Sequence, residues 1–209
     1  MKALVLCEVS GIWSEALWRR GYDVLQVDLA MPGLNVGDMV GRSDWVRMRG
    51  DVMQVSFEKF DVVCAFPPCT HLALSGARYW ASKAGSGDVL SAMALLTRCA
   101  KLAAGSRVAG VVENPRGLAS RVLGCASLEC HPWEFASGPD EHRMKRTALW
   151  LYGWPLVLRM SGCSRRPLTM VEWGSGLDGR EARAALRSHA WVGMASAFVA
   201  ALPFGGRSC

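Results

Sequence analysis

The sequence predicts an α/β fold built around an open β-sheet, and three observations support this prediction. The opening segment alternates between strand and helix patterns. The apolar run Val62–Phe66 has the length of a buried strand. The almost entirely apolar segment Gly87–Ala104 fits a buried crossover helix that leads into a further strand, Arg107–Val112. Because open α/β sheets bind ligands at the carboxyl ends of their strands, we expect the functional residues at these ends.

The 209 residues of the chain are enough for one hydrophobic core. No repeat, low-complexity tract or linker divides the sequence, so we expect residues 1–209 to form a single domain. Its apolar runs are interrupted well before the roughly 18 residues that suggest a membrane span. The N-terminal segment lacks the small-residue cleavage site of a signal peptide, so we expect a mature cytoplasmic protein without a membrane partner.

The formal net charge of +6 permits a polyanionic partner such as nucleic acid, although many basic proteins have none. Several of the eight cysteines, among them Cys7, Cys64 and Cys99, lie in apolar strand or helix patterns. A thiol in such a place behaves as a small hydrophobic group, so we expect these cysteines to be reduced. We expect no metal site, because the group within Cys125–His131 lacks a fourth ligand at the usual spacing.

The stretch Asp61–Gly76 carries the strongest chemical signal. Its strand runs into Pro67 and Pro68, which cannot continue a central strand, so the backbone must leave the sheet just before Cys69. Cys69 is thereby placed on a stiff loop at the end of the strand, where a thiol can attack a substrate. His71 follows closely and could tune this thiol, or could only pack or meet solvent.

The first 30 residues read as a strand, a helix and a second strand. Gly11 lies in the turn after the first strand, and Asp28 ends the second strand, where an acid can accept hydrogen bonds from a ribose. Only one of the three glycines of a dinucleotide fingerprint is present, so an ordinary turn explains this pattern equally well. The predicted elements are the strand Lys2–Cys7, a helix Trp13–Arg20 with Ser10 or Ser14 as its cap and Gly21 as its stop, and the strand Tyr22–Leu29.

Two further strand ends carry acids. Asp51 lies where a third strand would pass into its loop, near the base of a bound nucleoside, although a solvated loop aspartate fits the spacing equally well. Glu113-Asn114-Pro115 follows the strand Arg107–Val112, so a second strand is halted by proline with a reactive side chain at its tip. The remaining expectations are a loop at Met31–Arg49, a short helix at Leu118–Leu123, an irregular segment at Gly124–Arg143, a strand at Arg146–Tyr152 with a hairpin partner at Pro155–Met160, and a helix in two pieces at Arg180–Leu202.

These motifs follow one another in a recognisable order: Glu8-x-Ser10-Gly11, Asp28, Asp51, Pro67-Pro68-Cys69 and Glu113-Asn114. In this order they resemble the motif series of the DNA cytosine carbon-5 methyltransferases. The longer stretches CEVSG, PPCTHLALSG, VENPRG, HPWEF, KRTALWL and RSHAWVGMASA resemble a compact subgroup encoded largely by bacteriophages. Together these stretches extend over nearly the whole chain.

The resemblance implies a class I S-adenosylmethionine-dependent methyltransferase fold, which is Rossmann-like, with a mostly parallel seven-stranded sheet and an antiparallel edge. It implies S-adenosylmethionine or a close derivative as cofactor and DNA with a flipped cytosine as partner. No long variable region is present, so we expect no separate target-recognition domain. A role in restriction-modification, in which phage DNA is shielded from host nucleases, would fit this resemblance.

The resemblance also assigns roles by position. Cys69 would be the nucleophile, Glu113 the acid that protonates ring nitrogen 3 of cytosine, and Arg146 the basic residue that holds the flipped base. The residues that would line the cofactor are Glu8, Ser10, Gly11, Asp28, Asp51, Phe66 and Pro67. Those that would contact the substrate are Thr70, Asn114, Arg143 and Lys145.

The chemistry of carbon 5 explains why a thiol and an acid are needed together. Carbon 5 is a poor nucleophile until a group adds at carbon 6, and a thiolate can make that addition. The addition builds negative charge on the ring, which an acid at nitrogen 3 neutralises. The basic residues Arg143, Lys145, Arg146, Arg165 and Arg166 could bind the phosphates of an extruded or single-stranded nucleotide, or could only solvate a surface.

Three departures from the family pattern and two alternatives remain. The first motif lacks the usual aromatic residue and paired glycines, Thr70 stands where glutamine is common, and Ala73 stands where serine is usual. Thymidylate synthases also present a Pro-Pro-Cys to carbon 6 of a pyrimidine, so a mononucleotide substrate is one alternative. A catalytically silent DNA-binding relative is the other. An amino-directed methyltransferase is disfavoured because Phe66, before the two prolines, cannot accept hydrogen bonds from an exocyclic amine.

Overall fold

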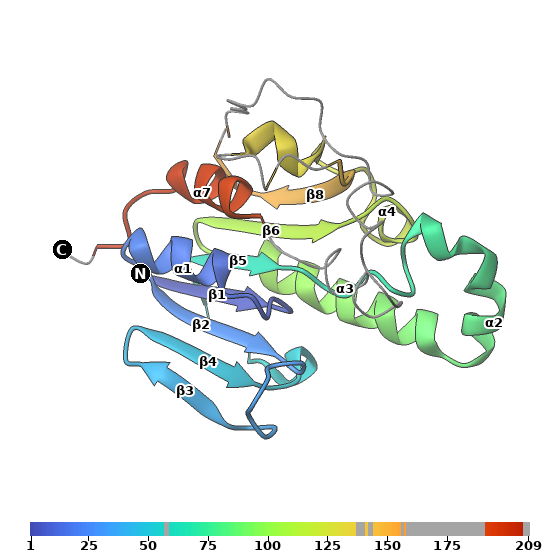
Figure 1. The fold of residues 1–209 in the computed structure, drawn as a ribbon, viewed down its shortest axis with the longest axis horizontal. Coiled ribbons are helices and arrows are strands. Elements are labelled where there is room, and N and C mark those ends of the chain that lie inside the picture. The colour runs from blue at the N-terminus through green and yellow to red at the C-terminus, as the bar shows by residue number, and fades with distance from the viewer. Residues whose placement is uncertain (57–58, 137–140, 142–143, 156, 158–190, 207–209) are drawn as a thin grey trace.

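A computed structural model describes residues 1–56, 59–136, 141, 144–155, 157 and 191–206 (Figure 1). These residues form one mixed sheet of eight strands in the order β3-β4-β2-β1-β5-β6-β8-β7. The α/β class predicted from the sequence is confirmed, but the expected count of seven strands is wrong. The additional strand arises because a segment predicted as a loop pairs at one edge of the sheet.

Five parallel strands form the centre of the sheet. They are β1 (Lys2–Leu6), β2 (Asp23–Asp28), β4 (Trp45–Arg49), β5 (Val62–Ala65) and β6 (Ala109–Asn114). β1, β5 and β6 are almost entirely buried, as expected for parallel strands that are covered on both faces. Because the five strands run in the same direction, their carboxyl ends share one edge of the sheet, here called the carboxyl edge.

Three strands pair antiparallel at the two sides of this centre. β3 (Met39–Arg42) pairs with β4, and β8 (Thr147–Tyr152) pairs with β6 on one side and with β7 (Leu128–Cys130) on the other. Since β8 runs against β6, it begins at the carboxyl edge. The residues just before Thr147 therefore lie near the end of β6.

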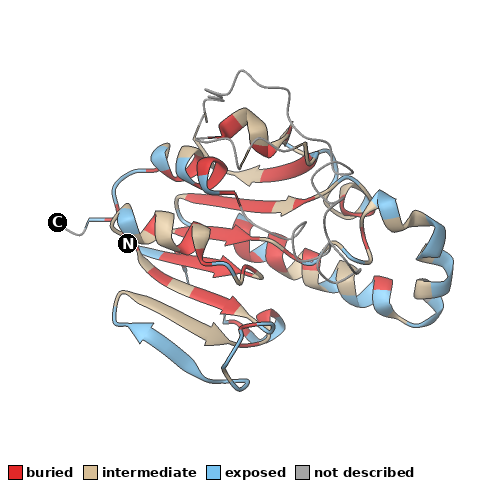
Figure 2. Ribbon diagram, in the orientation of Figure 1, coloured by how far each residue is buried: buried red, intermediate tan, exposed pale blue. Residues whose placement is uncertain are grey.

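Helices cover both faces of the sheet (Figure 1). α1 (Ile12–Arg19) and α7 (Val192–Ala200) contact each other on one face, and α3 (Asp88–Ala104) packs on the other with the short helix α4 (Ala119–Leu123). A separate cluster of buried apolar residues lies under each of these layers, and the buried segments of the ribbon in Figure 2 follow the central strands. The remaining elements are α2 (Trp80–Gly85) and the 3-10 turns η1 (Val52–Gln54), η2 (Leu74–Tyr79) and η3 (Pro132–Phe135).

Two segments predicted to lack regular structure contain strands. Met31–Arg49 was expected to be a loop but contains the hairpin of β3 and β4, and Gly124–Arg143 contains β7 and η3. The hairpin was missed because every residue of β3 is exposed, so no alternation of apolar and polar residues marks it. β7 was missed because a strand of three residues is too short to show a period.

Two predicted boundaries also differ from the structure. Gly11, not Ser10 or Ser14, is the N-cap of α1, and its φ of 81° requires a backbone that glycine adopts without strain. β6 continues to Asn114 instead of ending at Val112, because Glu113 and Asn114 pair with β8 before Pro115 ends the strand.

Two predicted elements fall mainly outside the described residues. The hairpin partner Pro155–Met160 is described only at Pro155 and Val157, and the first part of the helix Arg180–Leu202 is not described. Its second part corresponds to α7. Arg143, Arg165 and Arg166 also lie outside the described residues. Within the described part of the chain, no helix is both long enough and apolar enough to cross a bilayer.

Candidate active site

Cys69 lies on the loop that follows β5. Pro67 is buried and Pro68 is exposed, so the chain turns outward directly after the strand, and Cys69 is half-buried. The Cys69 carbonyl accepts hydrogen bonds from the backbone N–H groups of Leu72 and Ala73, both at 2.9 Å. This turn fixes the backbone that carries the thiol at the carboxyl edge of the sheet.

The loops after β5 and β6 are bound to each other. The Leu118 N–H donates to the Leu72 carbonyl at 2.8 Å, and the Leu74 N–H donates to the Arg116 carbonyl at 3.1 Å. Gly117 lies between these bonds, and a Cβ atom there would come within 2.0 Å of the Leu72 carbonyl oxygen. The approach of the two loops therefore depends on the absence of a side chain at position 117.

The side chain of Asn114 makes a further connection between the two strand ends. This residue is buried, and its Nδ2 donates a hydrogen bond of 2.8 Å to the carbonyl of Pro67. The neighbouring strands β5 and β6 pair up to Ala65 and Val112, one residue before Glu113. The structure thus brings Cys69 and Glu113 to adjacent strand ends, as the sequence predicted.

Glu113 contacts two residues at the start of β8. Thr147 donates a hydrogen bond from its hydroxyl to Oε1 of Glu113, and Lys145 Nζ lies 3.7 Å from the same oxygen. The side chains of Glu113 and Lys145 are only 13% and 16% exposed, and Thr147 is buried. A carboxyl group with a hydroxyl donor and a cation in such partial burial has one defined orientation.

Arg146, which was expected to hold the base, faces elsewhere. Its Nη2 lies 2.6 Å from Oε2 of Glu129 on β7, and its Nε donates to the same oxygen at 2.9 Å. The reason is the alternation of side chains along an extended chain, which sends Lys145 and Thr147 to one side and Arg146 to the other. The structure therefore places Lys145, and not Arg146, beside Glu113.

Phe66 and Thr70 lie on the two sides of the Pro67-Pro68-Cys69 segment in the sequence. Thr70 is exposed, and its carbonyl accepts a hydrogen bond of 3.0 Å from Lys83 Nζ. Phe66 packs against Trp13 of α1, with 5.1 Å between the ring centroids. Phe66 thereby joins the end of β5 to the helix that follows β1.

Glu8 and Ser10 form the turn between β1 and α1. Glu8 is 5% exposed, and its carboxylate accepts hydrogen bonds from the Gly11 N–H at 2.9 and 3.1 Å and from the Ser10 hydroxyl. Burial raises the pKa of Glu8, and the bonds from Ser10 and Gly11 oppose that rise. The carboxylate folds back onto the amino end of α1, where the helix dipole favours negative charge.

The ends of β1, β2 and β4 converge on Cys7, a residue that the sequence did not single out as functional. The pKa of the Cys7 thiol is raised by its hydrogen bond with Cys99, by burial, and by the charges of Asp28 and Asp51. Burial also raises the pKa of Asp28, whose Oδ1 accepts from the Ala30 N–H at 2.6 Å, and Asp51 accepts from the Met53 N–H at 2.9 Å. Asp28 pairs with Arg49, and the Gly50 N–H donates to the Asp28 carbonyl at 3.3 Å, so Asp28 and Asp51 lie at neighbouring strand ends.

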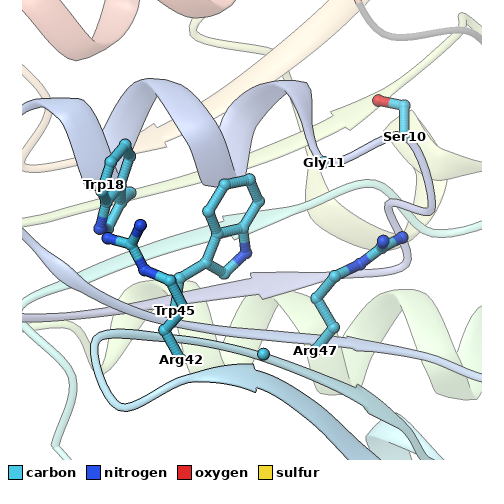
Figure 3. Close-up of a pocket in the computed structure, with 7 residues that line it drawn as sticks. Ser10, Gly11, Trp18, Arg42, Trp45 and Arg47 are labelled. Atoms are coloured by element: carbon cyan, nitrogen blue, oxygen red, sulfur yellow. The ribbon is translucent and has the colours of Figure 1, made fainter.

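A cavity of about 290 Å³ adjoins the turn between β1 and α1 (Figure 3). It is lined by Ser10, Gly11, Trp18, Gly41, Arg42, Trp45 and Arg47. The rings of Trp18 and Trp45 stack at 6.1 Å, Arg42 lies over Trp18 at 4.4 Å, and Arg47 donates to the Val9 carbonyl at 3.1 Å. The segment that joins β2 to β4 contains the strand β3 instead of a crossover helix, and Gly41 and Arg42 of β3 line the cavity. Sequence reasoning missed it because Arg42, Trp45 and Arg47 were assigned to a loop.

Among the described residues, no group of three or more His, Cys, Asp or Glu side chains is arranged to hold a metal ion. The side chains gathered at the carboxyl edge can instead supply a nucleophilic thiol, a carboxylic acid beside a cation, and carboxylates that accept hydrogen bonds. Cys69, Glu113 and Lys145 lie at the ends of β5, β6 and β8. Asp28 and Asp51 lie at the ends of β2 and β4, so the carboxyl edge can act on one substrate and bind one second ligand.

No protein-family model matches the sequence, and no curated protein matches it either. Among solved structures, the fold is similar to a crystal structure from E. coli described as a "putative DNA modification methyltransferase encoded within prophage". The TM-score is 0.51 at 13% sequence identity, over 85% of this chain and 55% of that chain. This chain thus spans about half the length of that structure, and at this identity the similarity establishes a shared mixed α/β fold.

Proposed function

We propose that this chain is a DNA methyltransferase of the class I fold that modifies carbon 5 of cytosine through a covalent adduct with Cys69. The observation that carries the proposal is the attachment of the Cys69 loop to the strand end that holds Glu113. Cytosine carbon-5 chemistry needs a thiol and an acid on one pyrimidine ring. The description of the similar structure as a putative DNA modification methyltransferase supports methyl transfer to DNA, the coarser part of the proposal.

Cys69 adds as thiolate to carbon 6 of cytosine, forming a carbon–sulfur bond and moving the ring electrons toward nitrogen 3. Glu113 donates a proton or a hydrogen bond to nitrogen 3 and so stabilises that charge. Carbon 5 is then nucleophilic. After carbon 5 has been substituted, a water molecule takes its proton, the electrons of the carbon–hydrogen bond form the carbon 5–carbon 6 double bond, and the carbon–sulfur bond breaks, so that Cys69 leaves as thiolate and the ring is aromatic again.

Lys145 takes the role that the sequence assigned to Arg146. Its ammonium group lies 3.7 Å from the Glu113 carboxylate and lies on the same side of the chain as Thr147, whose hydroxyl also reaches Glu113. A cation in this position orients Glu113 and offsets negative charge on a ring bound there. Asn114 holds the Cys69 loop in place through its hydrogen bond to the carbonyl of Pro67.

The residues at the ends of β1, β2 and β4 fit S-adenosylmethionine. β1, β2 and β4 are neighbouring parallel strands, so their carboxyl ends lie side by side, and Asp28 at the end of β2 is placed to accept hydrogen bonds from the ribose hydroxyls of a nucleoside bound there. Gly11 permits the tight turn beside them. S-adenosylmethionine bound here supplies an electrophilic methyl group.

Transfer of tritium from labelled S-adenosylmethionine to unmethylated DNA tests the proposal, with nucleoside digestion to identify the product. We expect label in 5-methylcytosine with the wild-type protein and with Cys125→Ser, an exposed cysteine away from the site, but none with Cys69→Ser. Transfer to free dCMP instead of DNA would favour the mononucleotide enzyme. DNA binding without any transfer would favour the silent relative.

A further inference from the structure

Two arginines and one glutamate form a charged cluster next to Glu113. Arg116 Nε lies 3.4 Å from Oε1 of Glu129, and Arg146 Nη2 lies 2.6 Å from Oε2 of the same carboxylate. The arginine side chains are 50% and 56% exposed, and that of Glu129 is 34% exposed. One carboxylate thus contacts two guanidinium groups, which leaves the cluster with one net positive charge.

This cluster joins the two strand ends that carry the acid. Arg116 follows Asn114 by two residues, and its carbonyl accepts the hydrogen bond from Leu74 on the Cys69 loop. Arg146 directly precedes Thr147, whose hydroxyl contacts Glu113. A chain of three residues from Glu113 to Arg116 spans at most about 11 Å. Because Arg146 points away from Glu113, the guanidinium groups lie on the other side of the chain, where a phosphate that flanks the nucleotide bound at Glu113 could reach them.

The chemistry of the cluster favours an anion with two or more oxygens. Half-exposed ion pairs contribute little to stability, so folding alone gives weak reason for two arginines on one carboxylate. Guanidinium groups bind carboxylates and phosphates with the same paired N–H donors. A phosphodiester carries a single negative charge, which the net charge of these three side chains would neutralise, and the guanidinium N–H groups that do not face Glu129 could donate to its two free oxygens.

We infer that Arg116 and Arg146 bind one phosphodiester of the DNA backbone beside the target nucleotide, and that Glu129 holds the two guanidinium groups in place until DNA binds. This inference rests on the proposed function for the identity of the polyanion. Glu129 also repels the incoming phosphate, so its charge lowers the affinity for DNA while it fixes the positions of the arginines.

The test measures binding of a fluorescent DNA duplex by anisotropy between about 50 and 200 mM salt, where each phosphate contact contributes roughly 0.9 to the slope of log K against log[salt]. For Arg116→Gln we expect a slope smaller by about 0.9 and an affinity roughly three- to tenfold lower at 0.1 M salt. Glu129→Gln should change binding in the opposite direction, with tighter binding and a steeper slope. The melting temperature of each variant checks its folding.

Arg107→Gln is the matched control. Arg107 is 57% exposed and lies 3.6 Å from Asp61, but it precedes β6 and so lies at the opposite edge of the sheet. Its replacement should leave the slope unchanged. Equal slopes for the wild-type protein and Arg116→Gln, equal losses in Arg107→Gln, or weaker binding by Glu129→Gln would overturn the inference.

The outcome is separable from that of the proposed function. A slope that depends on Arg116 in a protein that transfers no methyl group to DNA would support the phosphate site and overturn the proposed reaction. Methyl transfer to DNA with a salt slope that does not depend on Arg116 would support the proposed reaction and overturn the phosphate site. In an active enzyme, Arg116→Gln should raise KM for DNA and leave kcat nearly unchanged, because its partner is the backbone and not the reacting ring.

Discussion

The side-chain amide of Asn114 donates a hydrogen bond of 2.8 Å to the carbonyl of Pro67, and this bond attaches the end of β6 to the loop that carries the candidate nucleophile. Both residues are buried. The bond spans 47 positions in the sequence, and it explains how an acid on one strand and a thiol after another can hold a fixed relation.

Replacing Asn114 by Ala should therefore impair both folding and methyl transfer. The Pro67 carbonyl would lose its donor inside the protein, at a cost of about 1–3 kcal/mol in stability. Since the loop would also be free to shift, we expect kcat to fall roughly tenfold to a hundredfold. Urea unfolding and methyl-transfer kinetics measure the two effects. A variant that loses stability but keeps the wild-type kcat would contradict the positioning role.

Thr147 positions Glu113 through its hydroxyl. We therefore expect Thr147→Val to have a lower kcat than the wild-type protein and Thr147→Ser to keep a kcat close to that of the wild type. Valine keeps the shape of threonine but removes the donor that orients Glu113, and such a hydrogen bond is worth about 0.5–1.5 kcal/mol. This loss corresponds to roughly a twofold to tenfold change in rate. Serine retains the donor at the cost of one methyl group. Equal kinetics for the valine and serine variants would show that packing, and not the hydrogen bond, matters at position 147.

Gly117 should tolerate no side chain. A Cβ atom there would lie 2.0 Å from the Leu72 carbonyl oxygen, which would push apart the two loops that carry Cys69 and Glu113. We expect Gly117→Ala to cost about 2 kcal/mol or more and to abolish most activity. Gly85, in α2, has open space around its Cβ position, so Gly85→Ala should be neutral or slightly stabilising. Similar unfolding midpoints for the two variants would contradict this account of the loops.

Glu8 should give the protein a measurable pH dependence. Burial raises the pKa of Glu8 from its ordinary value of 4.5, so the folded state binds this proton more tightly than the unfolded state. The stabilisation that Glu8 provides is thus fully present below the unfolded pKa and is lost as the pH rises through the folded pKa. Glutamine does not ionise at any of these pH values.

The stability of Glu8→Gln relative to the wild-type protein should consequently increase as the pH rises from about 4 to about 7. The glutamine amide has a cost beside the Gly11 N–H, but this cost does not change with pH, so it does not affect the pH dependence of the stability difference. Urea denaturation of both proteins across this range gives the difference in free energy of unfolding. A difference that stays flat or decreases with pH would show that the carboxylate is not destabilised in the folded state.

The centre of the fold could be predicted from the sequence because buried strands and helices show a regular pattern of apolar residues. β1, β2, β5, β6, α1 and α3 all have apolar faces, and prolines or glycines mark their ends. The strand ends that carry Asp28, Cys69 and Glu113 were located in this way. Where burial leaves no pattern, as in the fully exposed β3, the prediction was wrong.

The orientation of side chains could not be predicted in the same way. Lys145 and Arg146 are adjacent and both basic, and only the pairing of β8 with β6 and β7 decides that Lys145 reaches Glu113 and Arg146 reaches Glu129. A register shift of one residue would exchange them. The partnership of Arg116 with Glu129 also depends on this pairing, since β7 did not stand out in the sequence.

The measurement that tests the central claim most directly is covalent capture on DNA that contains 5-fluorocytosine in place of cytosine. Cys69 can add to carbon 6 and carbon 5 can be substituted, but fluorine cannot leave as a cation, so the carbon–sulfur bond should persist. With S-adenosylmethionine present, we expect a protein–DNA species that survives denaturing electrophoresis for the wild-type protein and for Cys125→Ser. Peptide mapping should place the link at Cys69. A captured species that also forms with Cys69→Ser, or none with an enzyme that methylates ordinary DNA, would contradict the assignment of Cys69 as the nucleophile.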